Sequence, residues 1–238
     1  LVVMVTAWAD GYDSVTVSSQ PVTVARGTFT STPRSSISGA ARVGQTLTAT
    51  SSASVPAATP AFEWRADGVA IGSGASLTLT SAHLGKRITV VASATRAGYT
   101  TVSNTSAPVT VAAGTFTTKP KPTINGTVRV GQKLTAGGTT FVPAAAVAYA
   151  WKVDGKTVST GSSFTPAAEH RGKPLVLTVT ASKSGFTSVT QSTSKVTVAA
   201  GVFTTKPKPS ISGTVRVGQK LTAAGTGFAP AANLAYAW

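Results

Sequence analysis

The sequence contains no cysteine, so no disulfide can link its strands and its stability must come from packing. Acidic residues are also scarce, with six among 238 positions against 21 lysines and arginines. Calcium bridges between modules need clustered carboxylates, and six scattered acids do not supply them. The formal net charge is +15, which attracts polyanions and is screened by salt. These shortages exclude a disulfide scaffold and argue against calcium-linked domains.

A long apolar run is missing as well. The most apolar stretch, Leu1 to Val5, is too short for a signal peptide or a membrane span, so no membrane insertion is predicted. It lies 87 residues before Ile88 and 174 before Leu175, which begin two similar stretches. Because it recurs inside a repeat, we predict a core strand there.

What the sequence does have is a period of 87 residues. Two aromatic positions and one tetrapeptide recur at this spacing: Phe29, Phe116 and Phe203; Trp64, Trp151 and Trp238; and Arg-Val-Gly-Gln starting at residues 42, 129 and 216. A fixed period of this size is typical of an array of small modules.

The period divides the chain into the C-terminal part of a repeat (1–26), two complete repeats (27–113 and 114–200) and the N-terminal part of another (201–238). Neither partial repeat can close a sandwich of its own. We therefore expect the chain to be a section of a longer array. The less favoured alternative is that the ends of neighbouring chains complete each other by strand addition.

Within each repeat, short alternating stretches predict β-strands. In the second complete copy, residues 147–153 alternate with Trp151 on the apolar face, and Asp154-Gly155 follows as a hairpin signal. About seven such strands at a spacing of roughly ten residues are typical of a Greek-key β-sandwich. We predict an all-β chain of tandem sandwiches, with Trp64, Trp151 and Trp238 as core anchors. Very short linkers favour modules arranged as a rod.

A series of short motifs extends over each copy. In the second complete repeat they are Phe116-Thr-x-x-Pro-x-Pro, Ile124-x-Gly126, Val130-Gly131-x-x-Leu134-Thr135-Ala136, Tyr149-x-Trp151, Asp154-Gly155, Gly172-Lys173 and Gly185-Phe186. With these motifs the whole chain resembles the tandem Ig-like repeats of secreted and cell-surface proteins of actinobacteria. The resemblance implies Ig-like Greek-key sandwiches, an extracellular or cell-surface location, and a role as a stalk or adhesive array, in some proteins beside a hydrolase domain. An immune-type function is not implied, because the paired cysteines of antibody domains are missing.

Basic residues gather near the start of each repeat, most strongly in the last two copies. The candidate polyanion-binding residues are Lys119, Lys121, Arg129, Lys133, Lys206, Lys208, Arg216 and Lys220. They suit an anionic cell-wall polymer or polysaccharide, whereas specific nucleic-acid binding also requires interleaved exposed aromatics. The alternative is that lysines on an exposed proline-rich edge only prevent edge-to-edge aggregation. That alternative is favoured for the first complete copy, which keeps only Arg34 and Arg42 there.

The residues that could carry catalysis or bind a metal do not form a recurring set. His83 and His170 are one period apart, but Glu169 beside His170 is replaced by Ala82 in the other copy. We interpret both histidines as turn residues, because a metal site needs several ligands. Acids are too few to orient a catalytic histidine and no Gly-x-Ser-x-Gly elbow occurs, so no enzyme activity, cofactor or metal is predicted.

Aromatic residues also recur directly after a turn glycine, at Tyr12, Tyr99 and Phe186. Such a side chain can contact a ligand or pack within its own loop. We favour loop packing.

These patterns predict a structural or adhesive extracellular repeat array at the bacterial surface: a stalk, an adhesin or a fibre subunit. Its predicted partners are the protein itself, through neighbouring modules or filament subunits, and an anionic cell-wall polymer or polysaccharide. Two alternatives stay open. One is a set of accessory repeats of a secreted hydrolase whose catalytic domain lies outside this chain, and the other is a dedicated polyanion-binding module.

Overall fold

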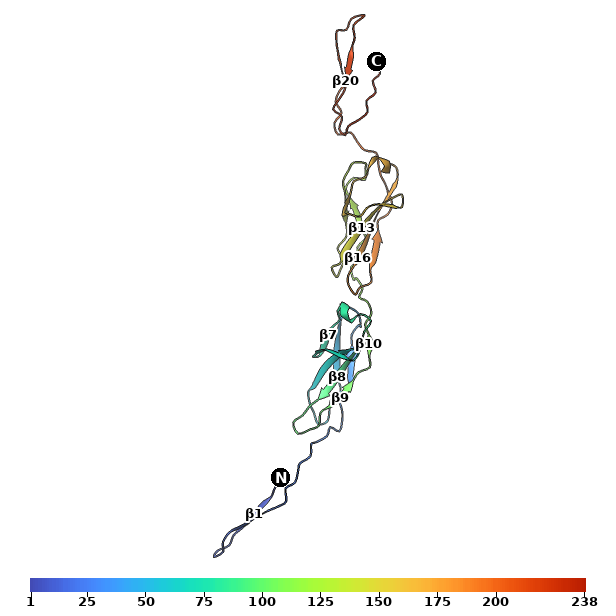
Figure 1. Cartoon of the computed structure of the whole chain (residues 1–238). Helices are drawn as coiled ribbons and strands as arrows, with labels where there is room; N and C mark the ends of the chain where they lie inside the picture. Colours follow the sequence, from blue (N-terminus) through green and yellow to red (C-terminus); the bar gives the residue numbers. More distant parts are fainter. The chain divides into compact units, whose positions relative to one another are not determined.

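The computed structural model describes residues 1–238, and almost all of its regular structure is β-strand (Figure 1). Its helical segments are two three-residue 3₁₀ turns, η1 (Ser81–His83) and η2 (Ala168–His170), and neither is long and apolar enough to cross a membrane. The composition accounts for this, because the abundant β-branched residues fit a pleated strand and glycine fits the turns between strands. The all-β prediction is confirmed.

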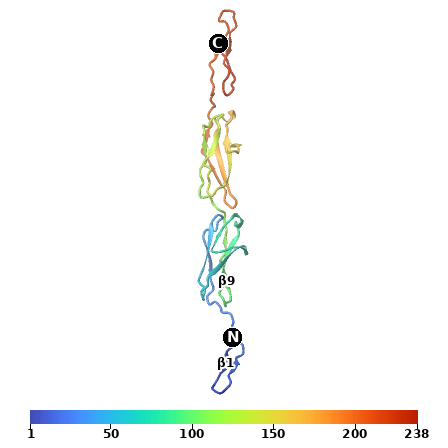
Figure 2. The same ribbon diagram turned by 90° about the vertical axis from the view of Figure 1, so that its left-hand side faces the viewer.

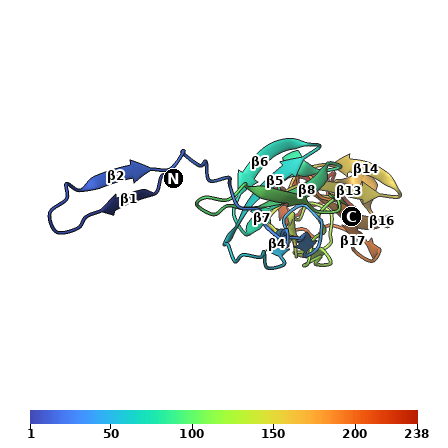
Figure 3. The ribbon, with the colours of Figure 1, turned by 90° about the horizontal axis from the view of Figure 1, so that it is seen from below.

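Residues 27–113 fold into two antiparallel sheets (Figure 3). The smaller sheet has the order β3-β4-β7 and the larger has the order β10-β8-β5-β6, with β9 pairing the other end of β8. The strands are β3 (Ser35–Ser38), β4 (Thr46–Ser51), β5 (Pro60–Ala66), β6 (Val69–Ser73), β7 (Ser76–Thr78), β8 (Arg87–Ala94), β9 (Val102–Thr105) and β10 (Val109–Thr110). The chain crosses between the sheets after its second, fourth and fifth strands, which is a Greek-key arrangement.

Residues 114–200 repeat the same architecture. One sheet has the order β11-β12-β15, and the other has the order β14-β13-β16-β17 with β18 pairing the start of β16. The strands are β11 (Thr123–Asn125), β12 (Leu134–Gly137), β13 (Ala146–Val153), β14 (Lys156–Ser159), β15 (Ser163–Phe164), β16 (Pro174–Ser182), β17 (Val189–Ser192) and β18 (Val196–Thr197). The register also repeats, since Trp151 stands opposite Leu177 as Trp64 stands opposite Val90. The prediction of tandem Ig-like sandwiches is confirmed by these two copies.

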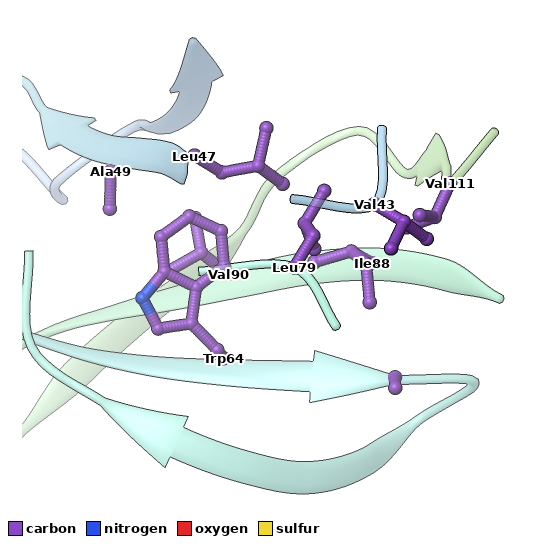
Figure 4. Packing of buried hydrophobic residues seen from close by; sticks show 9 residues of the cluster. Val43, Leu47, Ala49, Trp64, Leu79, Ile88, Val90 and Val111 are labelled. Carbon is purple, nitrogen blue, oxygen red and sulfur yellow. The ribbon is translucent and has the colours of Figure 1, made fainter. Parts of the chain in front are cut away.

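The core of each sandwich is built around a tryptophan on its third strand. Trp64 and Trp151 are fully buried, and each indole Nε1 donates to a carbonyl oxygen at 2.9 Å, of Gly74 and Gly161 respectively. An aromatic of this size dominates a small core once its N–H has an acceptor. Around Trp64 lie aliphatic side chains from both sheets and their connections: Val43, Leu47, Ala49, Ala66, Leu79, Ile88, Val90 and Val111 (Figure 4).

Two tight turns show the conformation that the Asp-Gly pairs predict. Asp67 and Gly68 have φ of 50° and 86°, and Asp154 and Gly155 have φ of 50° and 78°. Positive φ at both central residues matches the twist of the flanking strands and is the reason for Asp-Gly at these positions. The predicted hairpins β5–β6 and β13–β14 are confirmed.

The two partial repeats form hairpins that no second sheet faces (Figure 2). The pairs are β1 (Met4–Ala7) with β2 (Val15–Ser18), and β19 (Ser210–Ser212) with β20 (Thr222–Ala224). The side chains of residues 1–5 are exposed. The prediction of a buried core strand there is wrong, because β1 is covered on neither face.

Trp238 occupies the predicted anchor position of the last copy, yet its side chain is 77% exposed. Trp151 is enclosed because β13 pairs with β16 and because its ring packs on Phe164 of β15, with 5.7 Å between centroids. Residues 201–238 contain only β19 and β20, so no strand pairs with Trp238 or covers it. Burial of this tryptophan is a property of the closed sandwich rather than of its place in the repeat.

By their contacts the residues divide into two compact units. The first unit consists of residues 1–115 together with 184–187, and the second consists of 116–183 and 188–238. Six residues of the second complete copy, 114–115 and 184–187, thus belong to the unit built mainly by the first. The repeat boundaries drawn from the period stay predictions.

Candidate binding surfaces

The candidate basic residues of the copy at 114–200 fall into two pairs. Lys119 and Lys121 precede β11, whereas Arg129 and Lys133 lie between β11 and β12. Because the two strands are antiparallel, the lead-in to β11 and the β11–β12 connection lie at opposite ends of the hairpin. At about 3.3 Å per residue the pairs are on the order of 20 Å apart. The structure therefore does not gather the four side chains into one patch.

The basic residues of the last copy are arranged in the same way. Lys206 and Lys208 precede β19, and Arg216 and Lys220 lie between β19 and β20. All four are exposed. The register of β19 with β20 is that of β11 with β12 moved by one period, so these residues also form two separate pairs.

None of the eight candidate residues takes part in an ion pair. The two pairs in the structure join Arg65 to Glu63 at 2.6 Å and His170 to Glu169 at 3.9 Å. The positive charge at the candidate positions is therefore balanced by solvent ions alone, which leaves it available to a polyanion.

Arg129 differs from the lysines because it is half-buried. Its Nε atom is buried and has no hydrogen-bond partner. In the preceding copy the equivalent Arg42 donates from Nη1 to the carbonyl oxygen of Ala113 at 3.2 Å. A buried donor costs free energy until an acceptor reaches it. The Nε–H of Arg129 is thus an unsatisfied donor inside the fold, out of reach of an acceptor from outside.

The histidines close the two 3₁₀ turns. The Nδ1 atom of His83 accepts from the backbone N–H of Thr80 at 3.1 Å, and that of His170 accepts from Ala167 at 2.9 Å. No three His, Asp or Glu side chains lie together as possible metal ligands. These contacts account for both histidines as turn residues.

A different surface, which the motifs did not reveal, is formed by the turn that contains Gly185 and Phe186. This turn belongs to the first unit, where Phe186 packs against the core cluster that includes Val43. Gly114 holds the turn by two backbone hydrogen bonds. Its N–H donates to the carbonyl oxygen of Gly185 at 2.9 Å, and the carbonyl oxygen of Gly114 accepts from the N–H of Thr187 at 3.0 Å. Phe186 thus packs on the core of the preceding repeat and not only within its own loop, whereas Tyr12, for which loop packing was also predicted, is 80% exposed.

The same backbone clasp recurs in the first complete repeat. The N–H of Gly27 donates to the carbonyl oxygen of Gly98 at 2.9 Å, and the N–H of Thr100 donates to that of Gly27 at 3.0 Å. Tyr99 packs on Phe29 with 5.6 Å between ring centroids. Both complete copies therefore hold the turn against their own first residues in one way.

The contact of Phe186 is close enough to leave no room for side chains on two glycines. A Cβ on Gly44 would lie 3.0 Å from Cζ of Phe186, and a Cβ on Gly185 would lie 3.0 Å from Cγ1 of Val43 and 2.9 Å from Cα of Ser81. The exposed fraction of Val43 is only 4%. We call Val43-Gly44 the acceptor edge, and we call the glycine–aromatic turn that covers it the donor turn.

The acceptor edge and the donor turn both recur in the sequence. This recurrence is the sequence signal that points to them. The acceptor edge recurs as Val130-Gly131 and Val217-Gly218, and the donor turn as Gly11-Tyr12 and Gly98-Tyr99. In the second unit Val130 is only half-buried, and a Cβ on Gly131 would meet nothing within 4 Å. The same dipeptide is thus covered in the first unit and open in the second.

No protein-family model and no curated protein matches the chain. Among solved structures, it is similar to the D1–D4 ectodomain fragment of ICAM-5, with a TM-score of 0.36 and 17% identity over 75% of this chain and 56% of that one. It is also similar to three N-terminal domains of the outer capsid protein Hoc of bacteriophage RB49, with a TM-score of 0.31 and 17% identity over 84% of this chain and 70% of that one.

A third similar structure is a Ca²⁺-stabilized adhesin of an Antarctic bacterium that binds ice, with a TM-score of 0.34 and 12% identity over 97% of this chain and 66% of that one. The chain spans little more than half the length of the ICAM-5 fragment. At these TM-scores the likenesses carry no argument about function, and the fold rests on the sheets described above.

Proposed function

We propose that this chain is a structural and adhesive repeat array, a stalk, adhesin or fibre subunit that acts outside a bacterial cell at its surface. One observation supports this above the others: the donor turn of one repeat is part of the compact unit of the preceding repeat. A repeat whose end is completed by its neighbour shares stability with that neighbour. Such repeats serve by spacing and by many weak contacts rather than by one reactive centre.

Single-molecule force spectroscopy tests this role. Pulling the chain by its ends should give two unfolding steps, one for each closed sandwich. Each step should lengthen the chain by roughly 300 Å, since a repeat of 87 residues extends to about 3.5 Å per residue. Phe186→Ala should lower the force of one step, whereas Tyr12→Ala, at the same repeat position, should change neither. Extension without resolved steps would contradict the proposal.

A second candidate, binding of anionic cell-wall polymer or polysaccharide, is supported by the charge of the second complete copy. Residues 114–200 hold ten of the 21 basic residues and only two of the six acidic ones. The exposed lysines Lys119 and Lys121 have no ion-pair partner. Contacts of this kind are individually weak and gain strength from repetition along the array.

Affinity for heparin and for purified wall teichoic acid tests the second candidate. Lys119→Glu with Lys121→Glu should weaken binding roughly tenfold, equivalent to about 1.4 kcal/mol. The matched control, Lys156→Glu with Lys195→Glu, makes the same change of charge at two other exposed lysines and should weaken binding less. Equal losses in both double variants would show that net charge alone governs binding. No binding at low salt would eliminate this candidate.

A further inference from the structure

One asparagine of the second complete repeat differs in its surroundings from the other two asparagines of the chain. Asn125 is the last residue of β11 and is followed by Gly126, whereas Asn104 is followed by a threonine and Asn233 by a leucine. The carboxamide carbon of an asparagine can be attacked by the backbone nitrogen of the next residue. Glycine leaves that nitrogen the most accessible, because it has no Cβ. Of the three amides, that of Asn125 is therefore the most reactive by its sequence context.

The turn after β11 leaves the attacking nitrogen free. Asn125 and Gly126 are both exposed, and φ of Gly126 is 110°. Asn125 stands opposite Thr135 in the β11–β12 ladder, and the N–H of Gly126, just beyond the strand, makes no hydrogen bond. The equivalent Ser38 and Gly39 are exposed too, in the first complete repeat, which another complete copy follows. The exposure is thus a property of the turn itself.

The carboxamide of Asn125 is held only at its oxygen. Its Oδ1 accepts from the hydroxyl of Thr123 at 3.3 Å. Both side chains lie over Gly137 of β12, where a Cβ would be 2.5 Å from Oγ1 of Thr123 and 2.7 Å from Nδ2 of Asn125. In the first complete repeat the position of Gly137 is taken by Thr50, whose hydroxyl lies 2.7 Å from that of Ser36. The glycine therefore leaves the space that the amide occupies.

Asn104 shows the opposite arrangement. Its Oδ1 accepts from the backbone N–H and from the hydroxyl of Ser35, both at 3.1 Å, and its carbonyl oxygen accepts from the same hydroxyl at 3.0 Å. These bonds join β9 to β3 of the other sheet and fix the side chain of Asn104 in one conformation. One chain thus contains a fixed amide and a loosely held one.

We propose that Asn125 is a site of spontaneous deamidation in the folded chain. The backbone nitrogen of Gly126 loses its proton to water and attacks Cγ of Asn125, which closes a succinimide ring. The Cγ–Nδ2 bond breaks, and the nitrogen takes up a proton from water and leaves as ammonia. A second water opens the ring at either carbonyl carbon and gives aspartate or isoaspartate. The hydroxyl of Thr123 stabilises the negative charge that Oδ1 gains during the attack.

The product adds a negative charge to a basic part of the second unit. A Cβ on Gly126 would be 2.9 Å from the carbonyl oxygen of Lys133, so the turn lies against the segment that carries this lysine. Lys133 is exposed and outside any ion pair, and no acidic residue lies between β11 and β12. The new carboxylate weakens the attraction of this surface for polyanions. This consequence rests on the proposed binding of an anionic polymer, whereas the modification itself does not.

Peptide mapping by mass spectrometry tests the modification on the whole chain, sampled during incubation at neutral and at mildly alkaline pH. Replacement of NH2 by OH should be at least about tenfold faster at Asn125 than at Asn104 or Asn233. It should also be faster at the higher pH, because the attacking nitrogen must lose its proton. Asp67-Gly68 and Asp154-Gly155 can close the same ring without a change in mass, so the mass reports on the amides alone.

Two variants separate the chemistry from the fold. Asn125→Ser introduces the residue that the other two copies carry there, as Ser38 and Ser212, and should abolish the change in mass without lowering the unfolding temperature. Thr123→Val keeps a β-branched side chain and removes the hydroxyl, so it should slow the loss of the amide roughly threefold. The same chain unfolded in urea provides the reference rate.

Affinity for heparin measures the consequence for binding. Asn125→Asp carries the aspartate product from the start and should bind roughly twofold more weakly than Asn125→Ser at low salt. The difference should vanish at high salt, because the added charge acts through solvent.

Two results would overturn the modification site, and a third would overturn its effect on binding. Equal rates at the three asparagines would show that the glycine and the exposure of Asn125 have no influence. A rate in the folded chain more than about tenfold below that in urea would show that β11 protects the amide. Equal heparin affinities of Asn125→Asp and Asn125→Ser would exclude the effect on binding. A chain that loses the amide but never binds heparin would refute the polymer-binding candidate alone.

Discussion

Residues 114–138 and 201–225 are identical at 21 of 25 positions, yet they lie in different environments. Both form the same hairpin, β11 with β12 and β19 with β20, in registers that differ by one period. Phe116 is 2% exposed, whereas Phe203 is 43% exposed. The local sequence accounts for the hairpin in both places. The difference in burial comes from the strands that follow β12 and have no counterpart after β20.

The physical reason is that burial is a non-local property. The free energy gained by an apolar side chain is proportional to the area it removes from water, and that area is covered here by the opposite sheet. Hairpin register depends instead on turn residues and on the alternation of side chains, which are local. Equal sequences can therefore share secondary structure while contributing very different stability.

The largest expected difference concerns the tryptophans of these two copies. Trp151→Ala should lower the free energy of unfolding of the second unit by about 3–5 kcal/mol, because it leaves a cavity around a fully buried position. Trp238→Ala should change it by less than about 0.5 kcal/mol, because that side chain is mostly exposed. Urea unfolding followed by circular dichroism measures both. Equal losses would show that Trp238 is buried in solution and would remove the contrast.

The donor turns give the next largest difference. Phe186→Ala should lower the stability of the first unit by about 1–2 kcal/mol, because a half-buried ring leaves the acceptor edge. Tyr12→Ala, at the same repeat position, should have no measurable effect on the isolated chain. Hydrogen exchange of amides in β4 and β8 reports on the first unit specifically. Unchanged protection of these amides in the Phe186 variant would refute the coupling between repeats.

Two equivalent glycines separate the cost of the contact with Phe186 from the cost of backbone strain. Gly44 and Gly131 have φ of 85° and 78°, so replacement by alanine costs both about 1 kcal/mol of backbone strain. Gly44→Ala should cost about 1 kcal/mol more, because its Cβ meets the ring of Phe186 while that of Gly131 meets open space. Calorimetric unfolding of the two variants gives the difference directly. Equal costs would mean that the ring moves aside freely.

The smallest effect is expected at the lysines of the proline-rich lead-ins. Lys121→Glu and Lys208→Glu should each leave the stability unchanged within about 0.5 kcal/mol, because both side chains are exposed and outside any ion pair. Both should weaken heparin binding by similar small factors in an affinity assay. A large loss of stability in either variant would assign the lysines a role in the fold rather than in binding.

Much of the fold could be predicted from the sequence because its determinants are local. The alternation around Trp151, the Asp154-Gly155 pair and the 87-residue period indicated strands, turns and copies that the structure contains. The exposure of Trp238 could not be predicted from the period, since the period assigns equal positions but not equal neighbours.

The candidate surfaces were harder to predict because they depend on how strands run. Lys121 and Arg129 are close in sequence, and an antiparallel hairpin places them at opposite ends. Conversely, Gly44 and Phe186 are far apart in sequence and in contact in the first unit. The Val-Gly and glycine–aromatic dipeptides both repeat in the sequence, but nothing in their spacing indicates that one covers the other.

The clasp between Gly114 and the turn at Gly185, repeated between Gly27 and Gly98, uses only backbone N–H and carbonyl groups. Each clasp lies within one repeat and requires its first residue to be glycine, because a Cβ there would lie 2.7 Å from the ring of Tyr99 or Phe186. Unequal recombination within the gene that adds or deletes whole repeats would therefore carry a complete clasp along with every copy. The number of repeats can then change from one lineage to another without any new contact having to evolve.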